Sequence, residues 1–92
     1  MNRLIALQAE TVIVADDHPL FRKGVADLIG MEPALRLIGE APDGAAGVRL
    51  ARELGPDLIL LDLHMKGMDG IETLREIRAR HPLIQVILLT GH

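Results

Sequence analysis

The hydrophobic positions of the chain fall into four short runs separated by amphipathic stretches. The runs are Thr11–Ala15, Arg36–Ala41, Leu58–Leu61 and Gln85–Leu89. Three of them are apolar almost throughout, which is typical of parallel strands covered by helices on both faces. The run Arg36–Ala41 is more polar, and we expect it to lie at an edge of the sheet.

Each stretch between these runs carries the start and stop signals of a helix. Pro19 suits a first helical turn, and Asp43 and Asp69 suit N-caps. Gly55-Pro56 and His81-Pro82 would end the second and third helices. The apolar residues predicted to face the core are Phe21, Val25, Leu28 and Ile29 in the first helix, Leu50, Ala51 and Leu54 in the second, and Ile71, Leu74 and Ile77 in the third.

This alternation of strands and helices with short connections predicts one α/β domain over residues 11–92. Right-handed crossovers between the strands then give a doubly wound parallel sheet with the strand order 2-1-3-4. Residues 1–10 are interpreted as a lead-in to the first strand.

The composition narrows the class of protein. Hydrophobic residues make up 49% and charged residues 25%, as in a globular domain, and the absence of cysteine excludes disulfides and thiolate chemistry. No apolar run approaches the roughly 18 residues needed to cross a membrane, and we expect a cytoplasmic protein. With a net charge of −3, basic residues mixed among acidic ones, and one aromatic residue, the chain is not expected to bind nucleic acid by itself.

Acidic side chains follow two of the predicted strands. Asp16 and Asp17 come after the first strand and Asp62 after the third, and these strands are neighbours in the predicted order. Because ligands bind at the carboxyl ends of parallel strands, the three carboxylates should converge there. Carboxylates that lie this close together repel one another, which a bound cation would relieve. Their oxygen atoms are hard ligands of the kind that Mg²⁺ and Mn²⁺ prefer. Asp62 is the candidate nucleophile for a phosphoryl group, and Thr90 places a hydroxyl at the same edge.

Each of these residues also has a structural interpretation. Asp16 and Asp17 could be helix caps or turn residues, and the Thr90 hydroxyl could bond a local backbone group. His18 and His64 are predicted to be surface or capping residues, because no second histidine lies at metal-ligand spacing. The position of the acids and the threonine at the ends of three different strands favours a shared site.

Four motifs in the chain resemble the receiver domain of two-component response regulators of the NarL/FixJ type. They are VIVADDHP at Val12–Pro19, PDLILLDLHM at Pro56–Met65, GMDG at Gly67–Gly70 and VILLT at Val86–Thr90. The resemblance extends from about residue 11 to the end of the sequence. It implies the flavodoxin-like fold of the CheY-like receivers.

The resemblance also implies roles for individual residues. Asp62 would be the phosphoacceptor, Mg²⁺ or Mn²⁺ would bind to Asp16, Asp17, Asp62 and the backbone carbonyl of His64, and Thr90 would be the switch hydroxyl. The chain would be a signalling domain rather than an enzyme, taking its phosphoryl group from a sensor histidine kinase. Binding to DNA is expected only through a C-terminal domain that this sequence does not contain.

Two features depart from the family pattern. Lys66 stands where the family usually has proline, and it adds a cation near the acidic residues. The sequence ends at His92, before the fifth strand, the last two helices and the lysine that contacts the phosphoryl group in the family. We therefore expect a C-terminally truncated receiver whose exposed strand Gln85–Leu89 drives self-association, as a dimer or by swapped elements.

Two other functions remain open from the sequence. The chain could be a degenerate or truncated interaction module that keeps the fold without phosphotransfer. An aspartyl-nucleophile phosphatase of the haloacid dehalogenase type is less favoured, because that family has a second aspartate two residues after its nucleophile. Here His64 takes that position after Asp62.

Overall fold

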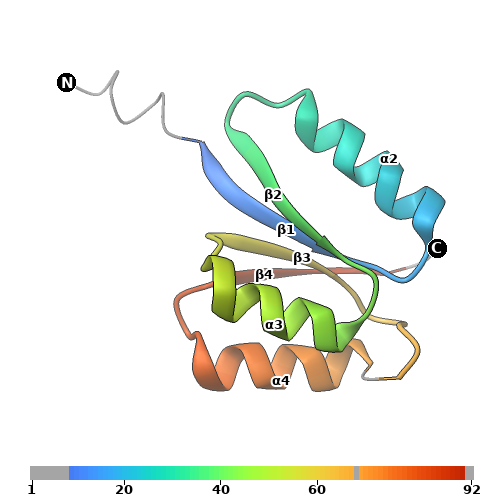
Figure 1. The fold of residues 1–92 in the computed structure, drawn as a ribbon, viewed down its shortest axis with the longest axis vertical. Coiled ribbons are helices and arrows are strands. Elements are labelled where there is room, and N and C mark those ends of the chain that lie inside the picture. Colours follow the sequence, from blue (N-terminus) through green and yellow to red (C-terminus); the bar gives the residue numbers. More distant parts are fainter. Residues whose placement is uncertain (1–8, 68, 91–92) are drawn as a thin grey trace.

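The structure is a computed structural model that describes residues 9–67 and 69–90, and it contains a parallel four-stranded sheet with helices on both faces (Figure 1). The elements in chain order are β1 (Glu10–Ala15), α2 (Pro19–Gly30), β2 (Leu35–Ala41), α3 (Gly44–Leu54), β3 (Leu58–Asp62), α4 (Gly70–Arg80) and β4 (Gln85–Leu89). The strands lie side by side in the order β2-β1-β3-β4. The predicted fold class and strand order are confirmed.

The local signals in the sequence act largely as expected. The side chains of Asp43 and Asp69 accept hydrogen bonds from Ala46 N and Glu72 N, at 2.8 Å and 2.9 Å, and so cap α3 and α4. Gly55 ends α3 with a φ of 54°, a left-handed conformation that glycine adopts readily. Of the predicted lead-in, residues 1–8 lie outside the described residues, and β1 already begins at Glu10.

The two central strands carry two separate hydrophobic cores, because successive side chains of a strand point to opposite faces. On one face the buried residues of β1 and β3 pack with residues of α3 and α4; this core contains Ile13, Ala15, Ile59, Leu61, Ala46, Ala51 and Ile77. On the other face Val12, Val14 and Leu58 pack with Ile29 of α2. Figure 1 shows α2 on one side of the sheet and α3 and α4 on the other.

The last strand is exposed at the edge of the sheet, as expected. Ile87 and Leu88 of β4 are 51% and 39% exposed, because among the described residues β4 pairs with β3 alone. The predicted inward faces of the helices were too wide, since Leu28, Leu54 and Ile71 are exposed. Successive helical residues point about 100° apart, so Ile29 takes the core position beside Leu28. The other two side chains lie in terminal helical turns.

Hydrogen bonds at the amino ends of the central strands fix how β1 and β3 align. The Thr11 backbone N–H and hydroxyl donate to Asp57 Oδ2 at 2.8 Å and 3.1 Å, and the Asp57 N–H donates to Thr11 Oγ1 at 3.0 Å. Further along, Ala15 pairs with Leu61. The residues that follow, Asp16 and Asp62, are therefore brought to the same place at the carboxyl ends.

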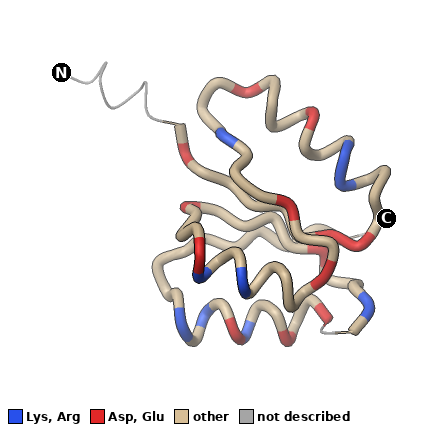
Figure 2. The backbone as a smooth tube through the Cα atoms, in the orientation of Figure 1, with Lys and Arg blue, Asp and Glu red and all other residues tan. Residues whose placement is uncertain are grey.

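Charged residues of both signs lie on each helix of the described part of the chain. Lys and Arg are interspersed with Asp and Glu along the outer helix α4 (Figure 2). Within residues 9–67 and 69–90, every helix is too short or too polar to span a membrane.

Candidate functional site

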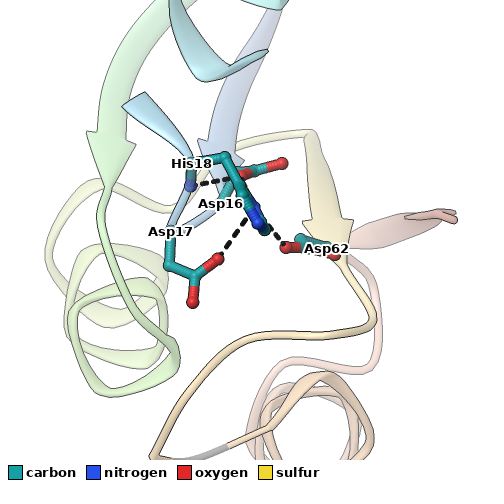
Figure 3. A group of neighbouring side chains, drawn as sticks. All are labelled: Asp16, Asp17, His18 and Asp62. Atoms are coloured by element: carbon teal, nitrogen blue, oxygen red, sulfur yellow. Dashed lines mark hydrogen bonds and ion pairs between the residues drawn. The ribbon is translucent and has the colours of Figure 1, made fainter. Parts of the chain in front are cut away.

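Four side chains come together where β1 and β3 end (Figure 3). One possible ligand atom from each of Asp16, Asp17, His18 and Asp62 lies within 4.8 Å of those of the other three. Asp16 and Asp62 have no exposed surface, and the Asp17 side chain is 16% exposed. The structure therefore joins the three acids expected at this edge of the sheet, and it adds a histidine.

The sheet itself places the two buried acids. The Asp16 N–H donates to the Ala41 carbonyl at 3.0 Å, which ties the end of β1 to the end of β2. Asp62 is the last residue of β3 and pairs with Leu89 of β4. The backbone of each of these two aspartates is thus fixed by its contacts with a neighbouring strand.

The same local hydrogen bond orients each of these carboxylates. Asp16 Oδ1 accepts from the His18 N–H at 2.7 Å, and Asp62 Oδ1 accepts from the His64 N–H at 2.9 Å. An aspartate that bonds the amide two residues later forms a turn and turns the chain out of the sheet. The turn role anticipated for Asp16 therefore coexists with its place in the cluster.

The imidazole of His18 lies against all three carboxylates. Its Nδ1 is 2.9 Å from Asp17 Oδ1, 3.2 Å from Asp16 Oδ1 and 3.6 Å from Asp62 Oδ2. His18 does occupy the N-cap position of α2, as expected, but its side chain forms no capping bond. The prediction of a surface or capping residue is therefore confirmed by its position and by its half-exposed side chain. The contacts of its ring with the three carboxylates were not predicted.

Two further residues, Arg22 and Lys66, bond the acidic loop, and neither contact was predicted from the sequence. The Arg22 guanidinium donates to the backbone carbonyl of Asp16 at 2.6 Å and pairs with Glu40 at 3.3 Å. The backbone N–H of Lys66 donates to Asp17 Oδ2 at 3.0 Å. These contacts depend on how the loops fold, which no residue pattern specifies.

The remaining predicted site residues lie at the same end of the sheet. Thr90 is exposed and directly follows Leu89, the residue that pairs with Asp62. His64 is also exposed, and its amide is already bonded to the Asp62 side chain. These two residues therefore lie at the same edge of the sheet as the cluster, and the His64 side chain is not one of its four members.

The chemistry of this cluster fits a divalent cation. Like charges held this close repel, and burial of Asp16 and Asp62 weakens the screening by water. Carboxylate oxygens are the hard ligands that Mg²⁺ and Mn²⁺ prefer. The donor set of the chain can therefore hold such an ion.

Comparisons with known proteins all point to one family. The family model described as the response regulator receiver domain matches residues 12–92. The nitrate/nitrite response regulator protein NarL of Escherichia coli K12 is 51% identical over 70 residues, which cover 76% of this chain and 32% of that protein. The transcriptional regulatory protein LiaR of Bacillus subtilis 168 is 48% identical over 80 residues, 87% of this chain and 38% of that protein.

The fold is also similar to that of a solved receiver domain. The signal receiver domain of the putative response regulator NarL from Mycobacterium tuberculosis matches with a TM-score of 0.84 at 40% identity, covering 92% of this chain and 68% of that one. The chain spans about a third of the length of the curated relatives, 32% of NarL and 38% of LiaR.

Gly70 allows α4 to start directly against the strand end that carries Asp62. A Cβ atom at this position would lie 2.5 Å from Leu63 Cα and 2.6 Å from the Asp62 carbonyl oxygen. The Gly70 N–H also donates to the Leu63 carbonyl at 3.2 Å. No side chain fits here unless the main chain of the site moves.

We expect Gly70→Ala to lower the free energy of unfolding by about 1–3 kcal/mol, because the added methyl group must displace main-chain atoms. Gly24→Ala is the matched control: its Cβ meets no atom within 4 Å in the interior of α2. That exchange should stabilise the protein by up to about 1 kcal/mol. Urea denaturation of both variants checks the prediction, and equal stabilities would contradict the close approach.

Proposed function

The chain belongs to the response regulator receiver domain family, as a receiver of the NarL type, and we propose that Asp62 is the residue that receives the phosphoryl group. The observation that carries this proposal is the cluster of three carboxylates around the tip of β3. Two of them are buried and come from the ends of adjacent strands. Aspartates that only formed turns at the surface would not need to be buried and clustered in this way.

The proposed transfer uses a carboxylate oxygen of Asp62 as the nucleophile. It forms a bond to phosphorus while the bond from phosphorus to a nitrogen of a phosphohistidine breaks, and the imidazole of the donor leaves. The product is an acyl phosphate. Because the transition state is loose, most of the rate enhancement comes from positioning and from charge neutralisation. β3 supplies the positioning, since Asp62 is paired with Leu89 within the sheet. The phosphohistidine would belong to a sensor histidine kinase.

We propose that Asp16, Asp17, Asp62 and the backbone carbonyl of His64 hold Mg²⁺ or Mn²⁺. When bound, such a cation offsets the negative charge of the carboxylates and of the phosphoryl oxygens. The Thr90 hydroxyl, at the end of β4, is proposed to donate a hydrogen bond to a phosphoryl oxygen and so report phosphorylation. The buried, closely spaced carboxylates support this assignment.

The His18 ring lies beside the buried carboxylate of Asp62. Asp62 has no exposed surface, and the His18 ring lies 3.6 Å from its Oδ2. The His18 side chain is 52% exposed, so the ring can rotate toward solvent without disturbing the core. We propose that this rotation opens the site to the phosphoryl donor.

The proposed role is that of a cytoplasmic signalling switch over residues 11–92, preceded by a lead-in over residues 1–10. Control of transcription would be exercised through DNA-binding residues outside this sequence, since Lys and Arg are interspersed with Asp and Glu along α4. The name of LiaR as a transcriptional regulatory protein supports this proposal. The phosphoryl transfer would be self-catalysed, with no other substrate turned over.

We expect the protein to gain the mass of one phosphate when incubated with acetyl phosphate and Mg²⁺, and Asp62→Asn to abolish this gain. Intact mass spectrometry measures the adduct. Asp27→Asn is the matched control, because Asp27 is exposed on α2 and should leave the adduct unchanged. His18→Ala should form the adduct at least as fast as the parent, since it removes the ring beside Asp62.

Other results of that experiment favour the other functions. The absence of an adduct in a parent protein that is folded would favour an interaction module without phosphotransfer. Sustained hydrolysis of a phosphomonoester that Asp62→Asn abolishes would favour the phosphatase. Labelling that persists in Asp62→Asn would falsify the assignment of the acceptor.

Mg²⁺ should raise the thermal midpoint of the protein, because an ion that binds the folded state alone stabilises it. An excess of about 100-fold over the dissociation constant corresponds to about 2.7 kcal/mol. In Asp17→Asn the shift should be largely lost, whereas Asp27→Asn should keep it. Differential scanning calorimetry at constant ionic strength measures both, and an equal shift in all three proteins would contradict the proposed site.

A polypeptide of these 92 residues is proposed to self-associate through β4. Ile87 and Leu88 are 51% and 39% exposed, and the described part of the chain leaves the outer edge of β4 unpaired. Such an edge readily pairs with a strand of another chain. A dimer made through β4, or by exchange of elements, would cover this surface.

Ile87→Lys should shift this polypeptide toward the monomer, because it places a charge on the exposed strand. Leu83→Lys is the control: Leu83 is 94% exposed but lies before β4. Sedimentation velocity over a range of concentrations measures the populations. A parent polypeptide that stays monomeric throughout, or equal effects of the two lysines, would contradict association through the strand.

A further inference from the structure

A backbone amide in the loop after β3 is bonded to an acidic side chain of the loop after β1. The Lys66 N–H donates to Asp17 Oδ2 at 3.0 Å, joining residues that are 49 positions apart in the sequence. Because the donor is the main chain, the bond is independent of the lysine side chain. It links the two loops that surround the acidic cluster.

Asp17 needs such a link more than the other two acids do. Asp62 is a strand residue, and Asp16 is tied through its N–H, its carbonyl and its side chain. Asp17 lies beyond the end of β1, and its side chain is 16% exposed. The direction of its carboxylate therefore depends on contacts made by that carboxylate itself.

The two oxygens of Asp17 face different partners. Oδ2 accepts the Lys66 N–H at 3.0 Å, while Oδ1 lies 2.9 Å from His18 Nδ1, on the side of the cluster. A carboxylate held through one oxygen can present the other to an ion in a fixed direction. Hydrogen bonds of this kind, made to ligands rather than to the metal, orient metal ligands in many proteins.

The identity of residue 66 decides whether this bond exists. The receiver family usually has proline at this position, and proline has no backbone N–H. Lysine, like any other residue except proline, supplies the donor. The departure from the family pattern thus has a structural consequence at Asp17, a proposed metal ligand.

We propose that Lys66 is a positioning residue whose backbone N–H aims the Asp17 carboxylate at the divalent cation and tightens its binding. This inference rests on the proposed function, which supplies the cation. The ammonium group of Lys66 has no part in it. A hydrogen bond to a charged acceptor is strong enough to select one orientation of a partly exposed side chain.

The test compares Lys66→Pro with Lys66→Ala, because both remove the ammonium group and only proline removes the N–H. Isothermal titration with Mg²⁺ measures the dissociation constant of each protein. We expect Lys66→Ala to stay within about twofold of the parent and Lys66→Pro to bind about tenfold more weakly. Equal dissociation constants for the two variants would overturn the inference.

Proline also stiffens the chain and restricts the preceding residue, Met65, which is buried. A semisynthetic protein separates that effect: replacing Lys66 by its α-hydroxy acid turns the amide into an ester and deletes the N–H without a ring. We expect the same loss of affinity in the ester protein, and an ester protein that binds like the parent overturns the inference whatever proline does. If Lys66→Pro does not fold, the ester protein alone decides.

The parent protein distinguishes failure of this inference from failure of the proposed function. A folded parent that does not bind Mg²⁺ removes the proposed metal site, and the inference falls with it. A parent that binds Mg²⁺ while the ester protein binds equally well leaves the metal site in place. In that case only the role of the Lys66 N–H is rejected.

Discussion

The alignment of β1 with β3 is the constraint on which the rest of the site depends. The bonds between Thr11 and Asp57 fix it at the amino ends of the strands, and pairing carries it to Ala15 and Leu61. A shift of one residue would turn every side chain of a strand to the other face, and it would put core residues in solvent. The two hydrophobic cores therefore fix the place where Asp16 and Asp62 meet.

The same burial makes the cluster energetically unfavourable on its own. Two unit charges about 4 Å apart repel by about 4 kcal/mol at an effective dielectric constant of about 20. The chain offsets part of this with donors directed at the carboxylates, namely the amides of His18, His64 and Lys66. These donors hold the oxygens in place without removing the charge, so the site keeps the negative charge that would attract the proposed cation.

The sequence was sufficient for the fold and for the three acids because both follow from local patterns. Apolar runs, caps and the rule for crossovers specify the strand order, and the strand ends then specify an acidic edge. The ring of His18 and the contacts of Arg22 and Lys66 could not be predicted, since they depend on the paths of two loops. The exposure of Leu28 was not predicted. The spacing of apolar residues along a helix locates the centre of its buried face more accurately than the edges of that face.

The site combines a residue on a strand with residues on a loop, and each arrangement suits a different part of the proposed switch. Asp62 stands on a central strand, so the carboxylate proposed to react is held in a fixed position. Asp17 and His18 lie on a loop, where one hydrogen bond or one ring rotation changes what they contact. A fixed acceptor keeps the chemistry reproducible, while loop residues can respond to the arrival of a cation and a phosphoryl group. The proposed switch would need both properties, because phosphorylation would also have to alter a surface that a partner recognises.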